Sequence, residues 1–184
     1  MFKRFVPTEI LWFVAIIWGV FLIDAILIGI NLNYFGIRPR HISGLHGILL
    51  SPFLHGGLYH LMSNSIAILI LGSLLKTSIG PKKLRLVMLL GAIGSGIGVW
   101  LFAANGLVVG ASGMVFAFLG YLFADALFNP SLRSWLFAIL SFITYGGALF
   151  SLVNFLPYIS WSAHFWGFVT GILLSYTLGR KRPQ

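Results

Sequence analysis

Two long stretches without Asp, Glu, Lys or Arg restrict the fold of this chain more than any other feature. They cover residues 86–124 and 134–179. A soluble domain has about a quarter of its residues charged, whereas charged residues make up 8% of this chain and hydrophobic residues 59%. Lipid is the natural solvent for such a sequence, and we expect an integral membrane protein.

Each uncharged stretch has room for two transmembrane helices, because a helix crosses the bilayer core with about 20 residues. Turn residues divide the first stretch at Asn105-Gly106 and the second at 154–157. Two more apolar segments come earlier, and the second of them ends at Gly80-Pro81. We therefore predict one all-α, polytopic membrane domain over residues 1–184. Its six predicted spans are 9–30, 58–78, 83–104, 112–128, 134–153 and 162–179.

The net charge of +9 is distributed unevenly over the predicted loops. Cytoplasmic loops of membrane proteins carry an excess of Lys and Arg. With both termini in the cytoplasm, ten of the twelve basic residues lie inside, and only Arg38 and Arg40 lie outside. The charge therefore predicts topology and contact with membrane lipids, and it argues against nucleic acid as a partner.

The segment Gly110-Ala111-Ser112-Gly113 opens the predicted fourth span. The first N–H groups of a helix have no intrahelical partner, so the Ser112 hydroxyl would lie beside donors that can bind an oxyanion. Gly110 and Gly113 would let a substrate backbone approach closely. So short a motif also arises by chance, and it is weak support on its own.

The predicted sixth span contains His164, followed by Gly167 and Gly171. Polar side chains inside a span are costly, which makes each a functional candidate. The two glycines form a G-x-x-x-G face that lets another helix pack closely. If this face meets the fourth span, Ser112 and His164 lie near the outer ends of adjacent helices. The alternatives are simple packing for the glycines and an interhelical hydrogen bond for the histidine. The fourth span offers a partner face in Gly113, Ala117, Gly120 and Ala124.

A third group, His55-x4-His60-x3-Asn64, leads into the predicted second span. His60 and Asn64 share one helical face, from which both can donate to a developing oxyanion. This pattern is much more specific than the serine motif. A metal site is the rival interpretation, but the glutamate of H-E-x-x-H is missing and the chain has no cysteine. We therefore expect no metal and no cofactor.

Together, the three ordered motifs resemble the rhomboid family of intramembrane serine proteases, over roughly residues 36–175. The resemblance implies a six-helix membrane bundle in which Ser112 is the nucleophile and His164 the base. It also implies that His60, Asn64 and the Ser112 backbone form the oxyanion hole, with His55 as a structural histidine. The expected partners are transmembrane protein substrates. The expected location is the bacterial inner membrane, with the active site opening to the outer side.

Two features depart from the pattern of many relatives. Phe116 stands where a tyrosine often stacks on the catalytic histidine, so the ring is kept and the hydroxyl is lost. The first loop lacks a Trp-Arg pair, and its Arg38-Pro39-Arg40 suggests a different anchor. The resemblance also points to span five and the loop from Asn154 to Trp161 as the gate through which substrate enters.

The sequence favours a Ser–His dyad over a triad, because the chain has only three acidic residues. Asp125 lies 13 residues beyond Ser112 on the same predicted helix, about 20 Å along its axis, too far to orient His164. Glu9 belongs to the inner end of the first span, and for Asp24 a structural hydrogen bond is expected. Phe116 is then the best candidate for holding the base by packing.

Two other functions stay open at the level of sequence. A rhomboid-like pseudoprotease would bind transmembrane helices without cutting them, although Ser112 and His164 are both present. A small transporter or channel would need polar residues along a path through the bilayer, whereas here they collect toward the outer half.

Overall fold

A computed structural model of the chain describes residues 6–27, 29–152 and 161–179. Every regular element within these ranges is helical, which confirms the predicted all-α class. The α-helices are α1 (Thr8–Ile26), α2 (Gly47–Leu50), α3 (Leu58–Phe102), α4 (Ser112–Phe128), α5 (Leu132–Tyr145) and α6 (Trp161–Gly179). The 3-10 helices are η1 (Leu32–Phe35), η2 (Ile42–Gly44), η3 (Ser51–Phe53) and η4 (Gly146–Leu152).

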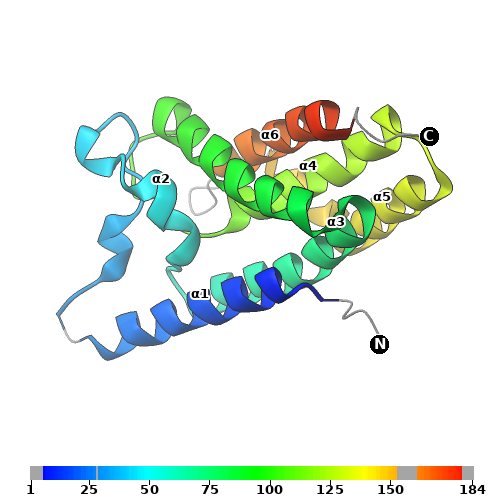
Figure 1. Ribbon diagram of the computed structural model, residues 1–184. Helices are drawn as coiled ribbons and strands as arrows, with labels where there is room; N and C mark the ends of the chain where they lie inside the picture. The colour runs from blue at the N-terminus through cyan, green and yellow to red at the C-terminus, as the bar shows by residue number, and fades with distance from the viewer. Residues whose placement is uncertain (1–5, 28, 153–160, 180–184) are drawn as a thin grey trace.

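Helix α3 contains both the predicted second span and the predicted third span. Its backbone leaves helical geometry at Gly80, where φ is 78° and ψ is 168°. Glycine adopts this left-handed φ without steric cost, and Pro81 follows directly. The two arms of α3 run in opposite directions on either side of this break (Figure 1).

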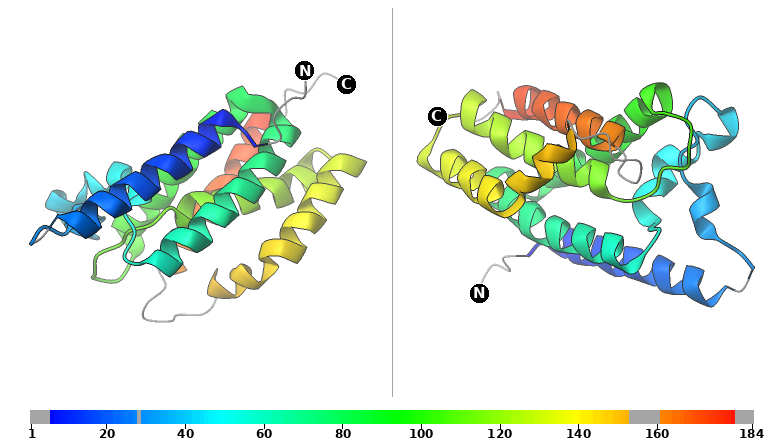
Figure 2. Two further views of the ribbon diagram at one scale, coloured as in Figure 1. Left: turned by 90° about the horizontal axis from the view of Figure 1, so that it is seen from below. Right: turned by 180° about the vertical axis from the view of Figure 1, so that it is seen from behind.

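Helix α4 lies at the centre of the bundle, and nearly all of its side chains are buried. It packs most extensively against α6 and also contacts α3 and α5. Figures 1 and 2 show α4 enclosed by these neighbours, with α1 packed on the outside of α3. The residues that begin α4 are therefore held from several sides at once.

The predicted bounds agree closely for α4 and α6 and differ for α1 and α5. Helix α1 ends at Ile26, four residues early, and the Asp24 carboxylate accepts the N–H of Leu32 at 2.6 Å. This bond turns the chain back toward the bundle. The predicted fifth span reaches 153 as one helix, but α5 gives way to η4 at Gly146-Gly147, because glycine is a poor α-helix former.

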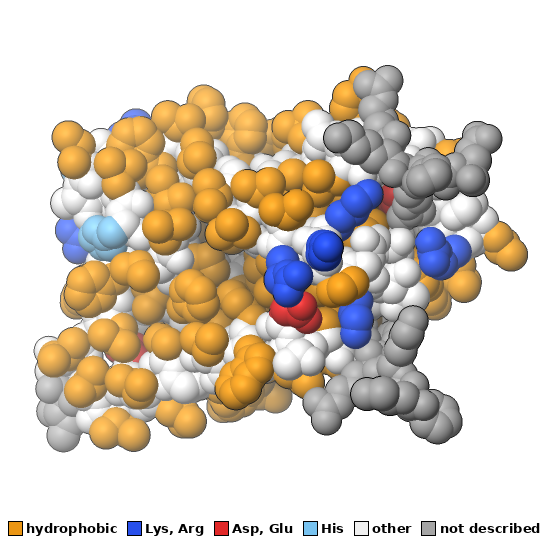
Figure 3. Space-filling model, in the orientation of Figure 1, with side chains coloured by type: hydrophobic (Ala, Val, Ile, Leu, Met, Phe, Trp, Pro, Cys, Tyr) orange, Lys and Arg blue, Asp and Glu red, His pale blue; other side chains and the backbone are white. Residues whose placement is uncertain are grey.

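Three described segments are long and apolar enough to cross a membrane: Thr8–Ile26, Leu58–Phe102 and Leu132–Phe150. Helix α4 is apolar but has only 17 residues. On the face drawn in Figure 3, Lys and Arg side chains gather toward one end and hydrophobic side chains cover most of the rest. Their contacts place three basic residues at this end: Arg85 pairs with Glu9, Lys83 donates to the Leu178 carbonyl, and Arg133 donates to the Ser78 carbonyl.

Candidate active site

Ser112 is the first residue of α4, with Ala111 as its N-cap. No side chain caps this end, so the N–H groups of the first turn point out of the helix without intrahelical partners. Gly110, just before, has a φ of 116°, and its N–H donates to the Ser51 carbonyl at 2.9 Å. Ser112 therefore begins the central helix, and its half-buried side chain lies beside several backbone N–H donors.

The aromatic ring of Phe116 lies flat against the imidazole of His164. Their centroids are 4.1 Å apart and the ring planes differ by 10°. Because residues four apart share one face of a helix, Ser112 lies one turn above this stack on the same face of α4. The nucleophile and base candidates thus come from two helices and meet around one buried ring.

Small residues make this close approach of α4 and α6 possible. A Cβ on Gly167 would collide with the backbone carbonyl of Gly113, and a Cβ on Gly171 with that of Ala117. A Cβ on Gly120 would collide with the Phe168 carbonyl. The G-x-x-x-G face of α6 and the small-residue face of α4 are therefore in direct backbone contact.

His60 and Asn64 lie on the other side of the Ser112 segment. A Cβ on Gly110 would lie 2.6 Å from Nε2 of His60 and 3.5 Å from Nδ2 of Asn64. His60 is also near enough to His164 for an electrostatic interaction. The three sequence motifs thus meet at the start of α4.

His55 orients Asn64. Nε2 of His55 lies 3.0 Å from Nδ2 of Asn64, and the rings of His55 and His60 meet edge to face with centroids 5.1 Å apart. Burial, together with the nearby His60, lowers the pKa of His55 to about 4. A neutral His55 can accept one N–H of the Asn64 amide, which leaves the second N–H for another acceptor.

The three acidic side chains of the chain are all engaged away from the site. Glu9 pairs with Arg85 at 3.4 Å, and Asp24 accepts from Leu32 and Asn33. Asp125 accepts from Ser78 at 2.9 Å and from Asn129 at 3.1 Å. No acidic side chain of this chain therefore lies beside Ser112 and His164.

Ser95 on α3 also contacts the residues of the site, and it is not among the residues predicted from the sequence. Its hydroxyl donates to the Ala163 carbonyl at 2.9 Å, and a Cβ on Gly113 would collide with this hydroxyl. Ser95 thereby joins α3 to the residues that precede His164 and follow Ser112. The run Gly94-Ser95-Gly96 in the third span was the available signal. The proposed gate loop at 154–160 lies outside the described residues.

The comparison with known proteins gives the family. A family model described as a rhomboid domain matches residues 42–181. The chain belongs to the rhomboid family. Rhomboid proteins are polytopic helical bundles in the membrane, so this chain is an integral membrane protein.

Several relatives of this rhomboid protein are known by sequence. An uncharacterized protein of Mycobacterium tuberculosis is 34% identical over 180 residues, which cover 93% of this chain and 74% of that protein. A second, from Mycobacterium leprae, is 31% identical over 179 residues, covering 92% and 70%. RHOMBOID-like protein 1 of Arabidopsis thaliana is 30% identical over 132 residues, which cover 72% of this chain and 34% of the plant protein.

Proposed function

We propose that this rhomboid protein is an intramembrane serine endopeptidase, which hydrolyses peptide bonds in or beside the transmembrane segments of other proteins. The observation that supports this most is the flat stacking of Phe116 on His164, one helical turn from Ser112. The Phe116 ring would hold the His164 imidazole near the Ser112 hydroxyl. No carboxylate can do so, because all three acidic side chains are engaged elsewhere.

In the proposed first half-reaction, His164 takes the proton of the Ser112 hydroxyl while the serine oxygen attacks the substrate carbonyl. A tetrahedral intermediate forms, and its oxyanion accepts hydrogen bonds from the Ser112 N–H, from His60 and from the free N–H of Asn64. The C–N bond then breaks, and His164 donates its proton to the leaving amine.

In the second half-reaction, water attacks the acyl-enzyme ester. His164 accepts a proton from the water, and the same donors stabilise the second oxyanion. The ester bond breaks, the proton returns to Ser112, and the carboxylic acid product leaves.

The test combines a serine-reactive fluorophosphonate probe with cleavage of a model single-span substrate in liposomes. Ser112→Ala and His164→Ala are each expected to abolish cleavage, and the double variant should lose no more than either alone, because the two groups act as a unit. Ser43→Ala is the matched control, since Ser43 is an exposed serine outside the site.

Proteolysis by Ser112→Ala at more than a trace level would refute the nucleophile assignment. A wild-type protein that neither reacts with the probe nor cuts, but still binds transmembrane helices, would instead be a rhomboid-like pseudoprotease.

We further propose a bacterial inner-membrane location in which the basic end of the bundle faces the cytoplasm. The start of α1 lies at this end, where Glu9 pairs with Arg85, and so does the end of α6, where the Leu178 carbonyl accepts from Lys83. The proposed active site then opens toward the outer side, where water for the second half-reaction is available.

A further inference from the structure

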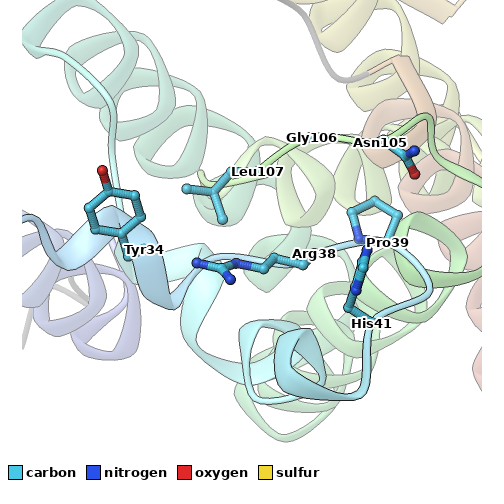
Figure 4. Close-up of a pocket in the computed structure, with 7 residues that line it drawn as sticks. All are labelled: Tyr34, Arg38, Pro39, His41, Asn105, Gly106 and Leu107. Carbon is cyan, nitrogen blue, oxygen red and sulfur yellow. The ribbon is translucent and has the colours of Figure 1, made fainter.

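A cavity of about 210 Å³ lies outside the proposed proteolytic site, between the first loop and the connection from α3 to α4. Tyr34, Arg38 and His41 line it from the first loop, and Asn105 and Leu107 line it from the connection (Figure 4). The cavity belongs to the end of the bundle opposite the lysine-rich end.

Arg38 brings an uncompensated positive charge to this cavity. Its side chain is exposed and has no hydrogen bond or ion pair among the residues that the structure describes. Arg40, two residues on, has its guanidinium engaged by the Ala103 carbonyl and by Asn105 Oδ1 at 2.7 Å. No carboxylate lines the described cavity, and both oxygens of Asp24 already accept hydrogen bonds.

The other polar groups of the cavity can donate hydrogen bonds to an anion. They are the Tyr34 hydroxyl, the His41 ring and the Asn105 side-chain amide, whose oxygen is taken by Arg40. Figure 4 shows the Arg38 guanidinium extending toward the Tyr34 side of the cavity, with His41 and Asn105 on the other side. The guanidinium alone matches the oxygens of a phosphate group, because arginine presents a planar fork of N–H groups.

The loop that forms the cavity is held in shape before any ligand arrives. The Arg40 N–H donates to the Trp100 carbonyl at 2.9 Å, and Ile37 and Val108 exchange two backbone hydrogen bonds. A Cβ on Gly44 would lie 2.6 Å from the Arg38 backbone. A preformed site loses less conformational entropy when it binds.

The loop that carries Arg38 also has exposed hydrophobic side chains that are suited to contact with lipid. Ile42 is 83% exposed and Leu49 59% exposed, and Phe35 and Leu45 are also exposed. At the end of a bundle that spans the membrane, such side chains can insert into the interfacial region, where the phosphate groups of phospholipids are found.

We propose that this cavity binds the phosphate of an anionic phospholipid head group, with Arg38 as its main ligand. The lipid would connect the first loop to the segment 105–107, which leads into Gly110 and Ser112. Binding itself does not depend on proteolysis.

The test measures lipid retention by the purified full chain in neutral detergent, using native mass spectrometry. The probes are phosphatidylglycerol, diacylglycerol with the same acyl chains, and inorganic phosphate. Wild type should retain phosphatidylglycerol and not diacylglycerol. Arg38→Gln should weaken this retention by about tenfold or more, because it removes a charged hydrogen bond. Lys82→Gln is the matched control, since it removes an equal exposed charge at the opposite end and should bind as wild type.

Equal retention by Arg38→Gln and wild type would overturn the proposal, as would equal losses in Arg38→Gln and Lys82→Gln. If inorganic phosphate binds tightly and phosphatidylglycerol cannot displace it, the ligand of the cavity is free phosphate and the lipid proposal is wrong. Should Arg38→Gln fail to fold, Arg38→Lys decides. It keeps the charge but loses the planar fork, and a weakening of roughly threefold is expected; unchanged retention would overturn the role of the guanidinium.

Discussion

At the scale of single residues, the proposed catalytic base is positioned by an aromatic ring. In a Ser–His–Asp triad a carboxylate fixes the imidazole by a hydrogen bond. Here the three acidic side chains are engaged elsewhere, and Phe116 stacks on His164 with an angle of 10° between the rings. Stacking limits the tilt of the imidazole without adding a charge to an apolar region.

An aromatic ring at position 116 should therefore be sufficient for the normal rate of cleavage, with or without a hydroxyl group. Phe116→Ala is expected to lower kcat by roughly 10- to 100-fold, because a misplaced reacting group costs rate on that scale. Phe116→Tyr keeps the ring and is the matched control, with kcat close to wild type. Steady-state cleavage of a transmembrane substrate measures the effect on kcat. A Phe116→Ala enzyme with wild-type kcat would show that the stack does not position the base.

At the scale of helices, backbone contact between α4 and α6 brings the two halves of the proposed dyad together. The contact depends on glycines whose Cβ positions are already occupied by the carbonyls of the partner helix. Backbone atoms cannot move aside as a flexible side chain can, so an added methyl group must separate the helices.

Gly171 gives a direct test of this packing. Gly171→Ala should lower stability by roughly 1–3 kcal/mol, the usual cost of overpacking, and should reduce cleavage because His164 moves away from α4. Gly19→Ala on α1 is the matched control, since a Cβ there meets nothing within 4 Å. It should be neutral or slightly stabilising, as alanine favours helix. Thermal unfolding in detergent compares the two, and equal melting temperatures would contradict the packing argument.

The helices and the motif positions could be predicted from the sequence more fully than the contacts between them. Uncharged stretches and turn residues were enough to locate α4 and α6. The glycine pair at Gly146-Gly147 was a signal for the end of α5. The 3-10 geometry of η4 could not be predicted, because apolar composition does not distinguish it from α-helix. The His55–Asn64 hydrogen bond and the role of Ser95 depend on how separate segments pack, and a single sequence does not specify that packing.

At the scale of the whole molecule, the bundle has two chemically different ends. One holds the lysines and arginines around the Gly80 break and the start of α5, together with the start of α1, where Glu9 pairs with Arg85, and the end of α6, where the Leu178 carbonyl accepts from Lys83. The other holds the first loop, the phosphate-binding cavity proposed above and the start of α4. Because basic loops are retained in the cytoplasm, this asymmetry predicts a single orientation in the membrane.

The absence of cysteine makes this orientation directly measurable, since any introduced thiol is the only one in the chain. Ser43→Cys places a thiol in the exposed first loop, and Lys82→Cys places one beside the Gly80 break. In intact spheroplasts, a membrane-impermeant maleimide should label Ser43→Cys and leave Lys82→Cys unlabelled. After the membrane is permeabilised both should react, which controls for the accessibility of each thiol. Labelling of Lys82→Cys in intact spheroplasts would show that the orientation is the reverse of the predicted one. The proposed active site would then open toward the cytoplasm.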